Sequence, residues 1–298
     1  MKRLKITYDS FRLLSFAILI PTLIITILPF ILIISASFTN EDILVRYGYS
    51  LLPKRFSLDA YIFLLSQWDI IGRAYGISIF VTIIGTLINT IISAGYAYAI
   101  YRKNNKYRKV LTFIVLFTLL FNGGIVPSYL MWTRFFHITD TIFALIVPNY
   151  LVNAINIFII RNYFSSNIPE AVIEAAKIDG ATELRVFRVI ILPMSLPVLI
   201  TVGIMTGLTY WNDWLNALYY INNPKLYGIQ NLLIRLINNI TFLQSSQAST
   251  LLGANVVKLP STALRMAMAV IGILPILIAL PFLLKFITKG MVMGAIKG

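Results

Sequence analysis

Residues 170–197 read EAVIEAAKIDGATELRVFRVIILPMSLP, a charged, loop-like stretch between two long apolar runs. Just before it, Asn167 is a good helix-capping residue, and Glu170 places a negative charge near the positive end of the helix that would follow. Gly180 can adopt the left-handed conformation with which many helices end. The stretch therefore predicts a short helix that stops near Gly180. A second helix is expected to start near Thr182 and to continue, past two prolines, into the next apolar run.

The predicted short helix has little side-chain bulk over much of its surface. Ala171, Ala175 and Ala176 are small, and two acids, Glu174 and Asp179, are expected to be exposed. A surface helix of this kind can fit closely into a groove on a partner. The stretch therefore indicates a docking element between two membrane-embedded parts of the chain.

The composition indicates a membrane protein with several spans. Of the 298 residues, 58% are hydrophobic and 12% are charged, and the mean hydropathy is +0.83, which is far from the values of a soluble domain. The chain has no cysteine and one histidine, His137. These counts exclude a disulfide, a Cys metal site and a His-rich metal site. We expect no metal site and no catalytic residue.

The expected fold is all-α, with a single transmembrane domain over residues 1–298. The six expected spans are 13–37, 74–101, 110–132, 141–160, 189–210 and 266–284. Span three is interrupted at 122–124, Asn-Gly-Gly, and residues 165–188 form a charged loop between spans four and five. Gly203 and Gly207 form a G-x-x-x-G pair in span five, which predicts close helix packing.

Lysine and arginine counts predict the side of the membrane on which each loop lies. The N-terminus, the loop after span two, the loop around Glu170 and the C-terminal tail contain sixteen of these residues, whereas the longer loops on the other side contain nine. Cytoplasmic loops have the excess of Lys and Arg. Both termini and the Glu170 loop are therefore expected in the cytoplasm. The same bias explains the net charge of +14 without a nucleic-acid partner.

Polar and aromatic residues in the predicted spans indicate a path for a polar solute. Asn149, Asn153 and Asn156 recur at helical spacing and would share one face of span four. Residues 210–214, YWNDW, lie at the outer end of span five. Amides and aromatic rings suit sugars, but hydrogen bonds between helices and an interfacial aromatic belt explain the same residues. The candidate path residues are Asn122, Asn149, Asn153, Tyr210, Trp211 and Asn212.

The opening stretch resembles the EAA loop of ABC-importer permeases. The family pattern is E-A-A, three residues, G, nine residues, I, one residue and L-P. Here it is met by Glu174-Ala175-Ala176, Gly180, Ile190 and Leu192-Pro193. With its six expected spans, the chain resembles a type I ABC importer permease of the carbohydrate family, similar to the shorter permease subunit of the maltose transporter. Residues 121–127, FNGGIVP, further resemble the branch that handles complex polysaccharide fragments.

The resemblance implies a multi-pass permease subunit in the plasma membrane of a prokaryote, forming half of the path for an oligosaccharide or polysaccharide fragment. It implies a heterodimer with a second permease, two cytoplasmic ATPase subunits and an extracytoplasmic solute-binding protein, with membrane lipid around the spans. ATP and Mg²⁺ would bind to the ATPases, because this chain has no Walker A motif and is expected to hold no cofactor. The residues expected to couple the loop helix to an ATPase are Glu170, Glu174, Ala175, Ala176, Asp179 and Gly180.

An ion-coupled secondary carrier for a polar solute is the main alternative. Spans two to six have no Asp, Glu, Lys or Arg in their interiors, whereas proton- or ion-driven carriers usually need such groups at membrane depth. Sodium sites built of backbone carbonyls remain compatible with the sequence. A membrane-embedded enzyme would have few candidate catalytic groups. A structural or signalling subunit would differ from a permease in not co-purifying with an ATPase.

Overall fold

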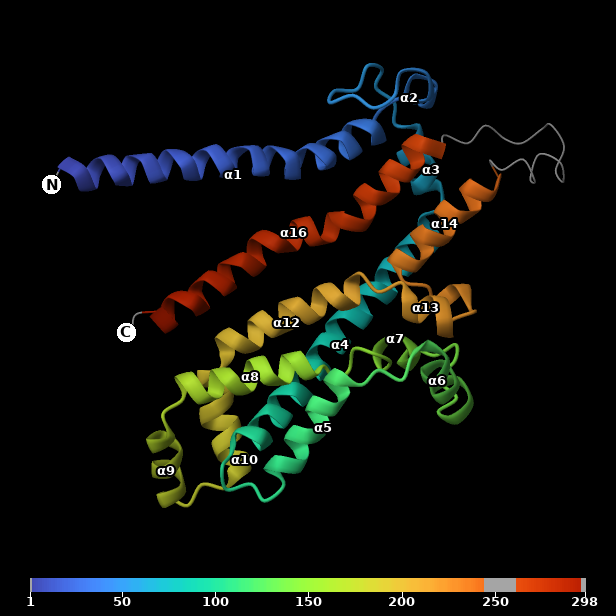
Figure 1. Cartoon of the computed structure of the whole chain (residues 1–298). Coiled ribbons are helices and arrows are strands. Elements are labelled where there is room, and N and C mark those ends of the chain that lie inside the picture. Colours follow the sequence, from blue (N-terminus) through green and yellow to red (C-terminus); the bar gives the residue numbers. More distant parts are fainter. Residues whose placement is uncertain (1, 244–260, 296–298) are drawn as a thin grey trace. The chain divides into compact units, whose positions relative to one another are not determined.

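A computed structural model describes residues 2–243 and 261–295, and the regular structure of these ranges is helical (Figure 1). The all-α class expected from the sequence is therefore confirmed for the described residues. Contacts group the chain into two compact units, Met1–Trp68 with Leu236–Leu274 and Asp69–Arg235 with Pro275–Gly298. The organisation as one transmembrane domain stays a prediction.

The first unit combines long apolar helices with short polar ones. Its helices are α1 (Lys2–Ser37), α2 (Glu41–Tyr47), α3 (Asp59–Ser66), the end of α14 (Ile229–Leu243) and the first part of α16 (Ser261–Ala295). The carboxylate of Glu41 accepts hydrogen bonds from the N–H groups of Thr262 (2.9 Å) and Ala263 (2.8 Å). The first N–H groups of a helix have no partner within it, so Glu41 supplies the N-terminal cap of α16.

Three described helices are long and apolar enough to cross a membrane. They are Phe11–Ser37 of α1, α4 (Trp68–Tyr101) and Thr262–Ala279 of α16. Two bent helix pairs raise the number to five if each pair is one span. These pairs are Arg108–Leu120 with Ile125–Phe135, bent by 117°, and Glu183–Met194 with Leu196–Trp211, bent by 78°. The number of six spans stays a prediction.

The second unit contains the loop with which the sequence analysis began. After α4 its elements are α5 (Arg108–Leu120), α6 (Ile125–Leu130), η1 (Met131–Phe135), α7 (Phe143–Ile146), α8 (Ala154–Asn167), α9 (Glu170–Ile178), α10 (Glu183–Val186), η2 (Phe187–Ile191), α11 (Leu192–Met194), α12 (Leu196–Trp211), α13 (Leu215–Tyr220), η3 (Pro224–Leu226) and the start of α14. α8 lies beside α12 (Figure 1). Buried Ile157, Ile160 and Phe164 of α8 belong to the same core as Val198 and Val202 of α12. This core fixes the two helices that flank the charged loop.

The segment expected as span four, residues 141–160, is not one continuous helix. α7 ends at Ile146 and α8 begins at Ala154, with irregular backbone between them. Pro148 has no N–H group, and its ring clashes with the carbonyl four residues earlier, so a helix is broken there. Asn149 follows in the left-handed conformation, with φ of 67°. The expected shared helical face therefore does not exist across this break.

Spans three and five are also interrupted. The break predicted at 122–124 is confirmed, because α5 ends at Leu120 and α6 begins only at Ile125. Span five was expected to continue past its prolines, but it bends by 78° at Ser195. Pro197 cannot donate to the carbonyl four residues before it. The inner part of this span thus forms a separate short helical segment.

The topology can be tested by labelling, because the chain has no native cysteine. Asn104 lies in the exposed turn after α4, and neighbouring Lys103 pairs with Glu170 at 2.7 Å, so this turn and α9 lie on the same side. We expect Asn104→Cys to react with a membrane-impermeant maleimide only from the cytoplasm. Lys54→Cys is the control, and it should react only from outside. Labelling of Asn104→Cys from outside would refute the predicted orientation.

Candidate functional site

The loop between α8 and α12 forms the predicted short helix, α9. The helix begins at Glu170 and ends at Ile178, close to the predicted end at Gly180. The predicted cap is wrong: Asn167 is the last residue of α8, and its side-chain amide donates to the carbonyl of Tyr163 (3.2 Å). Pro169 occupies the cap position instead, without a side-chain hydrogen bond. Because Asn167 belongs to the last turn of α8, it does not cap α9.

α9 has a buried face and an exposed face. Ile173 is fully buried, and Lys177 is half-buried. Glu174 and Ala175 are exposed, and Ile178 is 87% exposed. Glu174 makes no hydrogen bond or ion pair with the described residues. An exposed face that combines small, acidic and aliphatic side chains is available for a partner.

The turn after α9 has the geometry expected from the sequence. Gly180 has a φ of 79°, a left-handed conformation that side chains with a Cβ rarely adopt. Thr182 then caps α10, because its hydroxyl accepts from the N–H of Arg185 (3.4 Å). The prediction of a second helix starting near Thr182 is confirmed. Residues 179–182, with Gly180 in the left-handed conformation, thus link α9 to the helix that leads into α12.

Ion pairs at the end of α4 contact this loop, and the sequence analysis did not anticipate them. The ammonium of Lys103 lies 2.7 Å from the carboxylate of Glu170, which lowers the pKa of that carboxyl group. The carboxylate of Glu183 pairs with Lys177 (2.6 Å) and with Arg102 (3.4 Å). From the sequence, Arg102 and Lys103 were interpreted only as part of the Lys and Arg excess that predicts which loops are cytoplasmic. Their pairing could not be read from residues some 70 to 80 positions apart.

Inside the second unit, three buried polar side chains form an amide network, defined here as Asn89, Asn156 and Thr206. The Nδ2 group of Asn156 donates to Asn89 Oδ1 (3.1 Å) and to Thr206 Oγ1 (2.9 Å). The Thr206 hydroxyl in turn donates to Asn89 Oδ1 (3.3 Å). The network joins α4, α8 and α12. For Asn156, the predicted alternative of hydrogen bonding between helices is confirmed.

The amide network also supports the broken segment between α7 and α8. Asn89 Nδ2 donates to the backbone carbonyls of Tyr150 (2.7 Å) and Leu151 (3.1 Å). Asn216 of α13 donates to the carbonyl of Pro148 (3.1 Å) and accepts from the Asn149 side chain (3.2 Å). Irregular backbone in an apolar environment needs such partners. Side-chain amides therefore replace the helical hydrogen bonds lost at the break.

The predicted path residues in and around spans three and four are in different settings. Asn149 is exposed in the irregular segment. Asn153 caps α8, since its Oδ1 accepts from the N–H groups of Ile155 and Asn156. Asn122 is exposed, and its side chain accepts from the N–H of Gly124. The expectation that Asn149, Asn153 and Asn156 share one helical face is wrong.

The three predicted path residues at the end of α12 also differ from one another. Tyr210 is buried, and its hydroxyl donates to the carbonyl of Ile146 (2.8 Å). Trp211 is buried against Tyr75, at a ring-centroid distance of 6.2 Å. Asn212 is exposed and donates to the carbonyl of Leu208 in its own helix. Of these three, only Asn212 presents its side chain to the surroundings.

A close approach of α4 and α12 occurs at a glycine that the sequence analysis missed. A Cβ on Gly85 would lie 2.5 to 2.8 Å from ring atoms of Tyr210, so only glycine fits there. At Gly203 and Gly207 of the predicted G-x-x-x-G pair, the nearest atoms would be 3.8 and 3.4 Å away, both in Thr86. The pair does face α4, but the contact there is looser than the pattern predicts.

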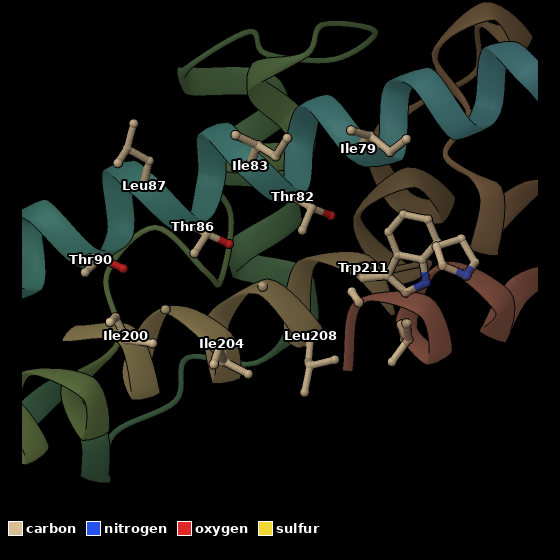
Figure 2. A pocket seen from close by; sticks show the side chains of 15 residues that line it. Ile79, Thr82, Ile83, Thr86, Leu87, Thr90, Ile200, Ile204, Leu208 and Trp211 are labelled. Atoms are coloured by element: carbon tan, nitrogen blue, oxygen red, sulfur yellow. The ribbon is translucent and has the colours of Figure 1, made fainter. Parts of the chain in front are cut away.

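A cavity of about 620 Å³ lies along this helix pair (Figure 2). Thr82, Thr86 and Thr90 point from α4 toward α12, and their hydroxyls have no hydrogen-bond partner among the residues that the structure describes. The rest of the lining is almost entirely apolar, with Trp211 as the one predicted path residue in it. The lining is Ile79, Thr82, Ile83, Thr86, Leu87, Thr90, Ile200, Gly203, Ile204, Gly207, Leu208, Trp211, Pro275, Ile276 and Ala279. An aliphatic wall of this kind is poorly suited to a sugar.

Comparison with known proteins identifies the chain. A family described as binding-protein-dependent transport system inner membrane components matches residues 90–293. The chain belongs to this family. The match includes the last third of α4, the charged loop and α12, so α9 and two members of the permease's amide network, Asn156 and Thr206, lie within the family region.

Curated relatives and a solved structure extend the match over nearly the whole permease. The chain is 36% identical to the polygalacturonan/rhamnogalacturonan transport system permease protein YtcP of Bacillus subtilis, over 97% of this chain and 98% of the relative. It is 26% identical to the arabinooligosaccharides transport system permease protein AraQ of Halalkalibacterium halodurans, over 92% of both. The structure of a bacterial ABC transporter involved in the import of the acidic polysaccharide alginate matches with a TM-score of 0.79 and 26% identity, over 94% of this chain and 97% of that one.

Gly85 gives a sharp test of the packing between α4 and α12. We expect Gly85→Ala to destabilise the permease by about 1–3 kcal/mol, because the added methyl group overlaps the Tyr210 ring. Gly203→Ala is the matched control and should be neutral or slightly stabilising, since its methyl group has room and alanine favours helix. Thermal unfolding of the detergent-purified protein measures both effects. Equal melting temperatures for the two variants would contradict this packing.

Asn89 tests the amide network. Asn89→Leu removes the donor to two backbone carbonyls, and each buried group without a partner costs roughly 1–3 kcal/mol. We expect a lower melting temperature and a lower yield of folded protein. Asn212→Leu is the control, because that exposed amide bonds only within its own helix. Wild-type stability of Asn89→Leu would show that the break does not depend on the network.

Proposed function

We propose that this chain forms half of the translocation path of an ATP-driven importer for an oligosaccharide or a polysaccharide fragment. The observation that carries the proposal is α9, a short helix with an exposed face in a chain of the binding-protein-dependent transport family. The names of the relatives support the substrate class, because polygalacturonan, rhamnogalacturonan, arabinooligosaccharides and alginate are all saccharide polymers or fragments.

The importer would contain subunits other than this chain. A second permease would complete the path, two ATPase subunits would bind ATP and Mg²⁺ in the cytoplasm, and an external protein would deliver the solute. The absence of a Walker A motif in the sequence supports a separate ATPase. The ion-coupled carrier is less well supported, because the family is defined by its dependence on a binding protein.

The coupling role of α9 follows from its two faces. Ile173 anchors the helix within the chain, and exposed Ala175 permits close approach of a partner. Glu174 would pair with a basic group of the ATPase, and Ile178 would enter an apolar pocket beside it. Gly180 then carries movement of α9 into α10. Glu170, Ala176 and Asp179 would complete the contact.

The irregular segment between α7 and α8 is the best candidate for a contact with the solute. Broken helices with polar backbone at membrane depth form the binding sites of several transporter folds. Asn149 is exposed there, whereas Asn153 is a helix cap and Tyr210 is buried. We therefore place the path closer to Asn149 than to Asn153. Asn122, Trp211 and Asn212 remain proposed path residues.

Two substitutions test coupling in different ways. Glu174→Ala should weaken ATPase binding, because truncating one member of a hydrogen-bonded charge pair at an interface costs roughly 2–5 kcal/mol. Gly180→Val should abolish transport while membrane insertion is preserved, since a β-branched residue is strained at a φ of 79°. ATPase co-purification and substrate-stimulated ATP hydrolysis in reconstituted complexes are the measurements.

Each variant has a matched control. Asp42→Ala removes another exposed acid, on the side predicted to be outside, and should leave ATPase binding unchanged. Gly180→Asn should retain much of the activity, because asparagine tolerates the left-handed conformation. Wild-type stimulation and uptake in both Glu174→Ala and Gly180→Val would refute the coupling role of α9.

A further inference from the structure

Three elements of the second unit meet at one carboxylate. Glu183 accepts a hydrogen bond from the Tyr98 hydroxyl of α4 (2.5 Å). It also pairs with Arg102, just after α4, at 3.4 Å and with Lys177 of α9 at 2.6 Å. Glu183 itself is the first residue of α10. We call these four residues the Glu183 cluster. It connects the end of α4 to both helices of the charged loop.

A second contact links the other end of α9 to the same place. Lys103 pairs with Glu170, the first residue of α9. Lys177 in the Glu183 cluster lies in the last turn of α9. Ionic contacts thus connect both ends of α9 to residues 98–103, the first end directly and the last end through Glu183. α9 is linked to α4 without any direct chain connection between them.

The two contacts differ in the burial of the groups that face the carboxylate. The side chains of Lys103 and Glu170 are 69% and 48% exposed, and exposed pairs contribute little because water and salt screen them. In the Glu183 cluster the side chains of Glu183 and Lys177 are 51% and 35% exposed, but Tyr98 and Arg102 are each only 9% exposed. Glu183 is the carboxylate that lies within 4 Å of the buried Arg102 guanidinium. Loss of the Glu183 charge would leave that guanidinium without an anionic partner among the described residues.

We propose that Glu183 is a positioning residue that makes α4 move together with α9. This inference rests on the proposed function, in which ATP hydrolysis displaces α9. From Tyr98, α4 continues to Asn89, nine residues or about 13 Å away at 1.5 Å per residue. Asn89 holds the carbonyls of the broken segment between α7 and α8. Displacement of α9 therefore reaches the polar break through α4, in parallel with the covalent route through α10 and α12.

The test is Glu183→Gln in the reconstituted complex of both permeases, the ATPases and the binding protein. Glutamine keeps the size of the side chain and an acceptor for Tyr98, but it loses the charge. We expect substrate transported per ATP hydrolysed to fall about tenfold, the effect of losing one charge-assisted hydrogen bond, while ATPase co-purification stays at the wild-type level. Tyr98→Phe should lower the same ratio by a smaller factor.

Arg185→Gln is the matched control. It removes a charge from the exposed surface of the same short helix, and Arg185 makes no ion pair with the described residues. Its transport per ATP should stay within about twofold of wild type, as expected for an exposed charge. If Arg185→Gln and Glu183→Gln lower the ratio equally, the effect is one of loop charge, and the role assigned to Glu183 is wrong.

A covalent rescue separates positioning from mere stability. In this cysteine-free chain, with cysteine-free partners, Tyr98→Cys combined with Glu183→Cys can be joined by a short bismaleimide. We expect the linker to restore transport per ATP relative to the unlinked double variant. A lower complex yield with an unchanged ratio would overturn the inference and leave Glu183 as a structural residue. Failure of the wild-type chain to co-purify with an ATPase would overturn the proposed function instead.

Discussion

The second unit depends on the satisfaction of backbone carbonyls where α7 is interrupted before α8. Pro148 breaks the helix within an apolar run of the sequence, where the freed backbone groups need hydrogen-bond partners. Asn89 and Asn216 supply the missing donors. Because Asn89 also bonds Asn156 and Thr206, the same interaction that permits the break fixes α4, α8 and α12 against one another.

Most sequence patterns with a local physical cause were read correctly, the wrongly predicted cap at Asn167 being the exception. Gly180 has the positive φ expected of a helix-ending glycine, Thr182 caps the next helix, and the break near Gly124 follows from local backbone preferences. The family resemblance of the charged loop was likewise local, because its residues lie within twenty positions of one another. These features required no knowledge of how distant segments meet.

The errors have two causes. Hydropathy averages over a window, so it hid Pro148 inside an apolar run and presented span four as continuous. Because span four was taken as one continuous helix, Asn153 was interpreted as part of a polar helical face. In the structure it caps α8. Contacts between distant residues were the second cause: nothing local indicates that Gly85 faces the ring of Tyr210, or that Arg102 meets Glu183. Such pairs are defined only when α4 is placed beside α12 and the residues after α4 are placed beside α10.

The mutual bonding of Asn89, Asn156 and Thr206 has an evolutionary consequence. Asn156 donates to both other members, Thr206 donates to Asn89, and Asn89 accepts from both and donates to the backbone, so replacing one member removes hydrogen bonds from the other two. The three positions are therefore expected to be epistatic: a substitution at one is tolerated only together with a compensating change at another. Asn149 lies outside this network, but its own bond to Asn216 and its positive φ restrict it separately. The scaffold that holds the irregular segment is thus expected to change only in concert.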